Sequence, residues 1–186
     1  MANSEKHNYK NVLDLCAGCG VVGIDFIHHL QSGNLKTPES IDFLEVQNIY
    51  NSHFARNISQ ISGLSSFNFL TMNYNKVFSH DDLKNKYDLI ICNPPYFRID
   101  RGILSTSDFK NRCRFFIDSD FDQLIKSIRY LLKSDGVAYV LIKDLQQNGI
   151  SMDAEIRKFS DFLNFTRCGM IRQTDFYRIS HRPNSG

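Results

Sequence analysis

The chain has 186 residues, of which 42% are hydrophobic and 23% are charged. This composition is typical of a folded globular protein and disfavours a disordered, fibrous or low-complexity chain. The 22 Lys and Arg residues only slightly exceed the 20 Asp and Glu residues, so the charge permits a polyanionic partner without requiring one. No apolar run approaches the roughly 20 residues that span a bilayer, and we expect no membrane association.

A chain of this length predicts one domain over residues 1–186, with a polar leader at 1–9 and a polar tail at 180–186. Such a domain buries roughly 70% of the surface of its unfolded chain, so it needs no disulfide bonds to fold. The five cysteines are odd in number and follow no secretory signal. We therefore predict free thiols and a cytoplasmic protein.

Short apolar runs alternate with helix-like segments along most of the chain. Five runs have the composition of buried strands: residues 11–15, 41–45, 67–70, 87–92 and 137–142. A helix is expected at residues 21–30, directly after a glycine-rich turn. The clearest helical stripe covers residues 121–132, with Asp118, Ser119 and Asp120 as candidate N-caps and Gly136 as the expected C-cap.

The C-terminal part departs from this alternation. Residues 165–171 and 176–179 resemble two closing strands, joined by residues 172–175 as a hairpin. The pattern as a whole predicts the α/β class, with a Rossmann-like, doubly wound and mostly parallel sheet and an antiparallel C-terminal strand pair.

In such a sheet the ligand binds beyond the C-terminal ends of the strands. Asp14 lies at the end of the first strand, and in the turn that follows Gly18 and Gly20 let the backbone pass close to a ligand. The spacing is not the G-x-G-x-x-G of a nicotinamide site, and an acidic strand end would repel a pyrophosphate. The turn therefore favours S-adenosylmethionine, with Asp14, Cys16, Gly18 and Gly20 as candidate contacts.

The next two strand ends carry polar residues suited to the adenosine part of that cofactor. Glu45 ends the second strand, where a carboxylate can accept hydrogen bonds from both ribose hydroxyls. Asn73 follows the third strand, where an amide could bond the adenine amine, although a solvent-facing turn is an equally good explanation. Both residues are candidate cofactor contacts.

The most specific motif is residues 93–97, directly after the apolar fourth strand. Pro94 and Pro95 stiffen the chain, so the Asn93 side chain and nearby carbonyls become preorganised acceptors. Such acceptors suit a planar NH2 group, whose nitrogen must pyramidalise before its lone pair can attack a methyl sulfonium. Tyr96 and Phe97 would stack on the planar group. We assign the catalytic role to residues 93–96 and expect Asn93 to border the cofactor as well.

On residues 14–20 and 93–97, the chain resembles class I S-adenosylmethionine-dependent methyltransferases, and most closely the bacterial tRNA(Val) adenine-N6 methyltransferases. The resemblance implies methylation of the adenine just 3′ of the anticodon, with the glycine-rich turn and Glu45 holding the cofactor. Two features depart from that family. Only a short polar stretch precedes the first strand, where family members carry a segment that closes the cofactor site, and Asn73 stands where many have Asp. The first departure leaves room for a protein partner or a homodimer.

The Asn-Pro-Pro-Tyr motif does not by itself identify the substrate. Enzymes that methylate guanine N2 in ribosomal RNA and glutamine N5 in release factors carry similar motifs, because all three substrates present a planar NH2 group. A non-enzymatic alternative is a cofactor-binding subunit of a methyltransferase complex.

A basic stretch next to the motif favours a nucleic acid. Residues 97–116 contain five Lys and Arg residues and two Asp residues, a local charge of +3, although a solvated loop is the alternative. Cations there would position a flipped base through its phosphates. We therefore expect an RNA substrate, in the first instance tRNA, contacted by Phe97, Arg98, Arg112 and Arg114.

Cys16 and Cys19 form a C-x-x-C pair, a spacing also found in zinc and redox sites. A structural zinc needs four ligands, and the sequence holds no second close pair. The histidines show no ligand spacing either, so no metal is predicted.

Overall fold

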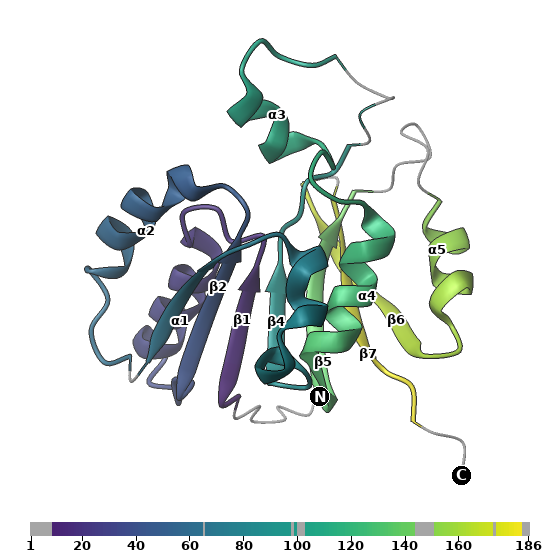
Figure 1. Cartoon of the computed structure of the whole chain (residues 1–186). Helices are drawn as coiled ribbons and strands as arrows, with labels where there is room; N and C mark the ends of the chain where they lie inside the picture. Colours follow the sequence, from purple (N-terminus) through teal and green to yellow (C-terminus); the bar gives the residue numbers. More distant parts are fainter. Residues whose placement is uncertain are drawn as a thin grey trace.

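The computed structural model describes residues 9–64, 66–97, 99, 103–143, 151–172 and 174–183. Within them, seven strands form one sheet in the order β3-β2-β1-β4-β5-β7-β6 (Figure 1). The strands are β1 (Asn11–Leu15), β2 (Ser40–Glu45), β3 (Phe67–Thr71), β4 (Tyr87–Cys92), β5 (Leu132–Ile142), β6 (Leu163–Ile171) and β7 (Thr174–His181).

The strand directions confirm the predicted fold class. Strands β1 to β5 pair in parallel, whereas β7 runs antiparallel to both of its neighbours, β5 and β6. The last residue of β1, Leu15, pairs with Leu44 on one side and Cys92 on the other. The C-terminal ends of β1, β2 and β4 therefore meet at one edge, where a doubly wound sheet binds its ligand.

Helices cover both faces of the sheet (Figure 1). On one face, α1 (Val21–Ser32) and α2 (Asn51–Ile58) bury Ile27 and Phe54 against β1 and β2. On the other, α4 (Phe121–Leu131) and the 3₁₀ segment η2 (Tyr74–Ser79) pack over β1, β4 and β5. The remaining elements are η1 (Asn48–Tyr50), η3 (Asp81–Leu83), α3 (Asp108–Arg114) and α5 (Met152–Phe159).

Helix α4 follows its predicted apolar stripe. Leu124, Ile125, Ile128 and Leu131 are fully buried, and each such side chain contributes roughly 1.5–3 kcal/mol through its removal from water. Asp120 is the N-cap, as one of the three candidates, and its carboxylate accepts a hydrogen bond from Gln123 N at 2.7 Å. The buried stripe therefore holds α4 against the sheet.

Three predicted boundaries are wrong. Gly136 does not cap α4, because the helix ends at Leu131 and Gly136 lies within β5, where a Cβ would come within 2.9 Å of the Tyr87 carbonyl oxygen. Strand β7 already begins at Thr174 and ends at His181, so the hairpin connection and the polar tail are both shorter than expected. Pairing with β6 extends β7 beyond its apolar run at both ends.

The longest helix in the described residues, α1, has 12 residues. None of the described helices combines the length and hydropathy needed to cross a bilayer.

Candidate functional site

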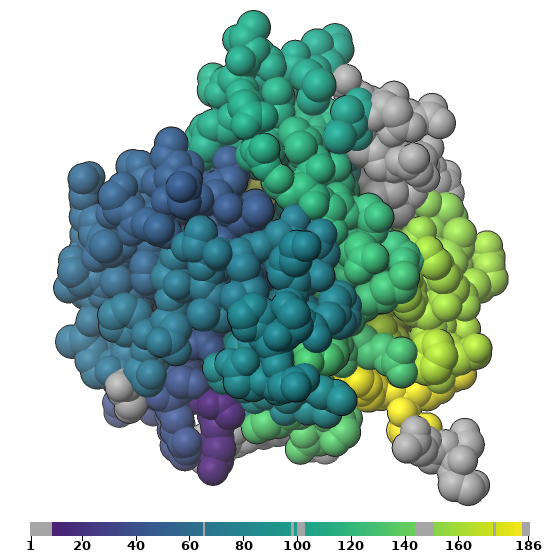
Figure 2. Space-filling view, in the orientation of Figure 1, coloured from purple at the N-terminus to yellow at the C-terminus, as the bar shows by residue number. Residues whose placement is uncertain are grey.

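A pocket of about 340 Å³ opens at the edge where β1, β2, β3 and β4 end. This volume lies within the roughly 300–1,000 Å³ of small-molecule and cofactor sites. Helix α3 lies above this edge, and in the space-filling view the segment around it projects from the rest of the molecule (Figures 1 and 2). The pocket is lined from five segments: residues 16–22, 44–50, 72–74, 93–95 and 112–119.

The turn after β1 adopts three left-handed conformations, at Cys16 (φ 63°), Gly18 (φ 55°) and Gly20 (φ 80°). Cys16 and Gly18, two of the predicted cofactor contacts, line the pocket. Gly20 does not line it: a Cβ there would lie 2.7 Å from the Phe54 ring, so this glycine allows the turn to pack on α2. The turn thus brings main chain close to the pocket.

Asp14 lies beneath this turn and does not line the pocket. The side chain is buried, and its Oδ2 accepts a hydrogen bond from Gly23 N at 2.8 Å, which ties β1 to the start of α1. Burial raises the pKa of Asp14 to about 7, against the opposing effect of the Gly23 bond. Asp14 therefore supports the loop that forms the pocket and does not make the predicted direct contact from its lining.

We predict that Asp14 makes stability pH-dependent. Its pKa is about 7 in the folded protein and about 3.9 when unfolded, so its stabilising contribution is complete below pH 4 and is lost as the pH rises through 7. Between pH 5 and 8, the free energy of unfolding should fall by roughly 2–3 kcal/mol more than in Asp14→Asn, which keeps the Gly23 acceptor. Urea denaturation of both proteins measures this difference, and parallel pH profiles would contradict it.

Glu45 is also buried but faces the pocket. Its Oε2 accepts a hydrogen bond from Gly18 N and its Oε1 from Gln47 N, both at 2.8 Å. Burial raises the pKa of Glu45, although both backbone bonds oppose the shift. Each carboxylate oxygen keeps a lone pair for a ribose hydroxyl, so the site fits the predicted role.

Replacing Glu45 tests that role. Glu45→Gln loses a charged acceptor, and we expect S-adenosylhomocysteine to bind about 1–3 kcal/mol more weakly. Isothermal titration calorimetry gives the affinity, and Glu39→Gln is the matched control because Glu39 is a surface residue paired with Lys10 before β2. Equal affinities for the two variants would show that Glu45 is only a structural residue.

Asn73 lines the pocket but is already engaged on both sides. Its Nδ2 donates to the Asp118 carbonyl oxygen at 2.6 Å, and its Oδ1 accepts from Asn75 N at 3.1 Å as the N-cap of η2. A second lone pair on Oδ1 remains for an adenine amine.

The Asn-Pro-Pro-Tyr-Phe motif follows β4 as predicted. Asn93 and Pro95 line the pocket, Pro94 is buried, and the Tyr96 hydroxyl donates to Asn93 Oδ1. Burial raises the pKa of Tyr96, which keeps its hydroxyl protonated as a donor. This bond holds the Asn93 amide in one orientation and leaves its oxygen a second lone pair.

Backbone hydrogen bonds to residues 114–116 hold the motif in place. The Tyr96 and Phe97 N–H groups both donate to the Arg114 carbonyl oxygen, at 3.1 and 2.9 Å, and Phe116 N donates to the Phe97 carbonyl oxygen at 2.8 Å. The motif is thus held by main chain from the end of α3, a pairing that no sequence periodicity indicates.

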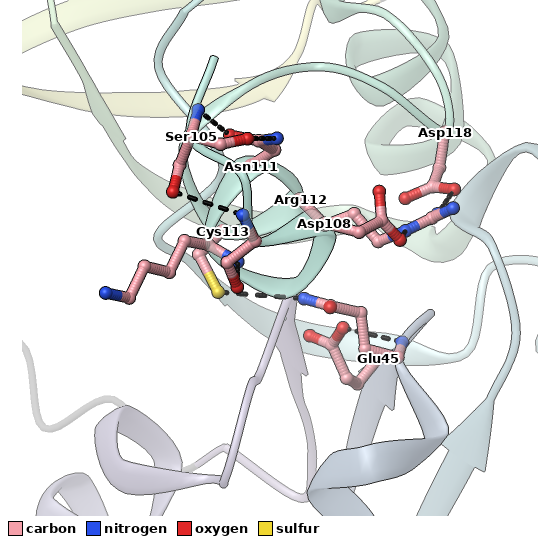
Figure 3. A network of polar contacts seen from close by, with 10 residues as sticks. Glu45, Ser105, Asp108, Asn111, Arg112, Cys113 and Asp118 are labelled. Atoms are coloured by element: carbon pink, nitrogen blue, oxygen red, sulfur yellow. Dashed lines mark hydrogen bonds and ion pairs between the residues drawn. The ribbon is translucent and has the colours of Figure 1, made fainter.

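Helix α3 contacts both sides of the pocket (Figure 3). On one side, Cys113 Sγ lies 3.2 Å from the Tyr50 hydroxyl and 3.7 Å from Gln47 Nε2. On the other, the Arg112 guanidinium pairs with Asp118 and, at 3.0 Å, with Asp108. Gln47, Tyr50 and Cys113 line the pocket without having been predicted from the sequence, and Asp118 was predicted only as a possible helix cap.

The predicted substrate residues separate into two groups. Arg112 lines the pocket, whereas the Arg114 guanidinium lies 5.7 Å from the centre of the Phe97 ring. Lys143 Nζ lies 5.6 Å from the same ring, so two cations accompany one aromatic side chain beside the motif. Arg98 lies outside the described residues.

The described cysteines are free thiols. Cys16 and Cys19 line the pocket. A search of the described residues for three or more His, Cys, Asp or Glu side chains able to hold a metal ion finds no such group.

Solved structures of low sequence identity share this fold. An rRNA methylase from Streptococcus thermophilus superposes with a TM-score of 0.61 at 10% identity, covering 94% of this chain and 88% of that one. The chain thus has the fold of the class I S-adenosylmethionine-dependent methyltransferases, which confirms the predicted resemblance. S-adenosylmethionine is the methyl donor that this fold implies.

Curated relatives make the likeness more specific. The tRNA1(Val) (adenine(37)-N6)-methyltransferase of Flavobacterium psychrophilum is 26% identical over 73% of this chain and 54% of its own length. The type II methyltransferase M.AccI of Acinetobacter calcoaceticus is 24% identical over 75% of this chain and 29% of its own length. The chain therefore spans about half or less of these two relatives. No protein-family model matches it.

Proposed function

We propose that this chain is an S-adenosylmethionine-dependent N-methyltransferase that acts on the exocyclic N6 amine of adenine in RNA, in the first instance a tRNA adenine next to the anticodon. One observation carries the proposal: Asn93 and Pro95 line the same pocket as Gly18 and Glu45. An amine bound to Asn93 would therefore face the methyl donor. The curated relative from Flavobacterium psychrophilum bears the name of this reaction.

The pocket fits the cofactor in the character of its donors and acceptors. The bent backbone at Cys16 and Gly18 leaves space for a ligand, Glu45 presents a carboxylate to a ribose, and Asn73 presents an amide to an adenine. When bound, S-adenosylmethionine supplies an electrophilic methyl group. No step of the proposal needs a metal ion.

Asn93 is the residue that would act on the amine. Its Oδ1 accepts a hydrogen bond from the NH2 group, which favours a pyramidal nitrogen and directs the lone pair towards the methyl donor. The Tyr96 hydroxyl holds the amide in place, so catalysis is mostly alignment. Asn93 is exposed, and the proton released after transfer can pass to water.

The side of the motif away from the pocket favours a nucleic acid over a protein substrate. Phe97 offers a ring on which a base can stack, and Arg114 and Lys143 lie close enough to that ring to reach the adjoining phosphates. A glutamine side chain on a protein would not need this combination. The guanine-N2 alternative keeps the same surface and differs only in the base.

Product analysis decides between these substrates. The chain is incubated with labelled S-adenosylmethionine in three separate reactions, which contain total RNA, a tRNA transcript or cell protein. The products are identified by mass spectrometry. We expect N6-methyladenosine in the tRNA. Label in guanosine or glutamine alone would overturn the adenine assignment.

Asn93→Ala should lower methyl transfer by about 10²–10³-fold, the usual effect of removing one preorganised hydrogen-bonding group. Affinity for S-adenosylhomocysteine should stay nearly unchanged, since Asn93 acts on the amine. Asn93→Asp keeps an acceptor and should retain part of the activity. Single-turnover rates and calorimetry measure both effects, and full activity of Asn93→Ala would rule out the alignment mechanism.

Arg114→Ala should weaken RNA binding and reduce the slope of log K against log salt concentration by up to about one. The slope falls because each phosphate contact releases counterions from the RNA, and the variant makes one such contact fewer. Lys36→Ala removes the same charge from the loop before β2, where Lys36 is exposed, and serves as the control. Fluorescence anisotropy over a salt series gives both slopes, and identical slopes would exclude Arg114 from the RNA surface.

A further inference from the structure

The helices cover the two faces of the sheet unequally. Helices α1 and α2 follow β1 and β2 and pack on one face, whereas η2, α4 and α5 follow β3, β4 and β5 and pack on the other. The face of β5, β7 and β6 that is turned away from α4 and α5 therefore has no helix of its own among the described elements. We call it the open face.

The residues of the open face follow from strand alternation, because they lie next to those buried under α4 and α5. Its central part consists of Tyr139 and Leu141 from β5, Phe176 and Arg178 from β7, and Thr166 and Gly169 from β6. Thr166 is exposed and the other five are half-buried. A Cβ on Gly169 would meet nothing within 4 Å, so this part of the sheet has space for a ligand beside it.

Two rows of side chains cross the open face. Arg178 pairs with Tyr139 on one side and Thr166 on the other, and Phe176 pairs with Leu141 and Gly169. The Tyr139 and Phe176 rings are 5.2 Å apart, with an angle of 12° between their planes. A base can add to such a stack as a third ring.

The charge of the open face suits a polyanion. The paired segments 137–142, 163–171 and 174–180 contain one acidic residue, Asp175. Asp175 lies on the opposite face, since it pairs with the buried Ile142, and its Oδ1 accepts a hydrogen bond from Arg167 at 2.8 Å. Arg178 therefore has no acidic neighbour on the open face of these segments.

The open face leads to the catalytic motif. Lys143 directly follows β5, and its Nζ lies 5.6 Å from the centre of the Phe97 ring. At the usual rise per residue, Lys143 is roughly 13 Å along the strand from Tyr139. The open face thus continues the basic and aromatic surface beside the motif.

We propose that the open face is a second part of the RNA-binding surface and holds the strand that leads away from the adenine at Asn93. Arg178 pairs with a phosphate of that strand, and a base stacks on the rings of Tyr139 and Phe176. This inference rests on the proposed function and adds the place where RNA outside the target nucleotide binds.

The composition of the open face favours RNA over a protein partner. A surface that a protein covers is typically a contiguous apolar patch, whereas here Thr166 and Arg178 flank the aromatic pair. Aromatic side chains on an uncovered sheet, together with cations, are a common way to bind unpaired bases of RNA.

The test is binding of a fluorescently labelled tRNA transcript to Arg178→Gln and Phe176→Leu, measured by anisotropy over a salt series. Arg178→Gln should reduce the slope of log K against log salt concentration by up to about one. Phe176→Leu should weaken binding at least about fivefold, the lower end of the usual loss for one base stacked on an aromatic ring. Turnover at saturating RNA and affinity for S-adenosylhomocysteine should change less than twofold.

Arg129→Gln is the matched control. Arg129 also lies against an aromatic ring, with its guanidinium 4.0 Å from the centre of the Phe162 ring, but it belongs to α4 on the covered face. This variant should bind RNA as the wild-type protein does.

Unchanged RNA binding by folded Arg178→Gln and Phe176→Leu, or an equal loss in Arg129→Gln, would overturn the inference and leave the proposed function intact. An equal loss of S-adenosylhomocysteine affinity would show that the sheet is disturbed and would also overturn it. Failure of the wild-type protein to bind or methylate RNA would instead overturn the proposed function together with this inference. Circular dichroism shows whether each variant is folded, and either folded variant is sufficient for the decision.

Discussion

The site depends on one hydrogen bond, from the Gly18 N–H to the Glu45 carboxylate. The turn after β1 begins beyond Leu15, the last residue of β1 that pairs with β2. A backbone hydrogen bond from Ala17 N to the Leu44 carbonyl oxygen continues the contact with β2, and the 2.8 Å bond from Gly18 N to Glu45 extends it to the lining of the pocket. The bond to Glu45 holds the left-handed backbone at Gly18 against the edge of the sheet, and it orients the Glu45 carboxylate at the pocket.

Three buried acidic residues in the sheet show how differently one side-chain type can be used. Asp42 accepts hydrogen bonds from Asn68, Lys86 and Tyr87, so its charge is compensated and its role is structural. Asp14 receives a single backbone bond and carries a strongly raised pKa. Glu45 lies between these cases, with two backbone bonds and open lone pairs. Burial alone therefore does not identify a functional carboxylate: of these three residues, Glu45 is the one that lines the pocket.

Local patterns predicted the strands well and the contacts across the site poorly. The bounds 11–15 and 87–92 match β1 and β4 because a buried parallel strand is apolar along its whole length. The position of Asn93 followed directly from the end of β4. Gly136 was misassigned because a rule for helix ends cannot see the Tyr87 carbonyl that excludes a side chain there. The pairing of Arg112 with Asp118 was not predicted because Asp118 lies just beyond the basic stretch 97–116, and only the folded chain brings the two together.

The single antiparallel strand has a consequence for the order of synthesis. The lining residues of the pocket all lie between Cys16 and Ser119, so a ribosome completes them before it makes β5, β6 and β7. Strand β5 then pairs with β4 on one side only, and its apolar outer edge stays open until β7 binds to it. Exposed edges of this kind recruit other chains. A nascent chain can therefore hold every described residue that lines the pocket and still be prone to aggregate, until β7, which contributes no residue to that lining, covers the edge of β5.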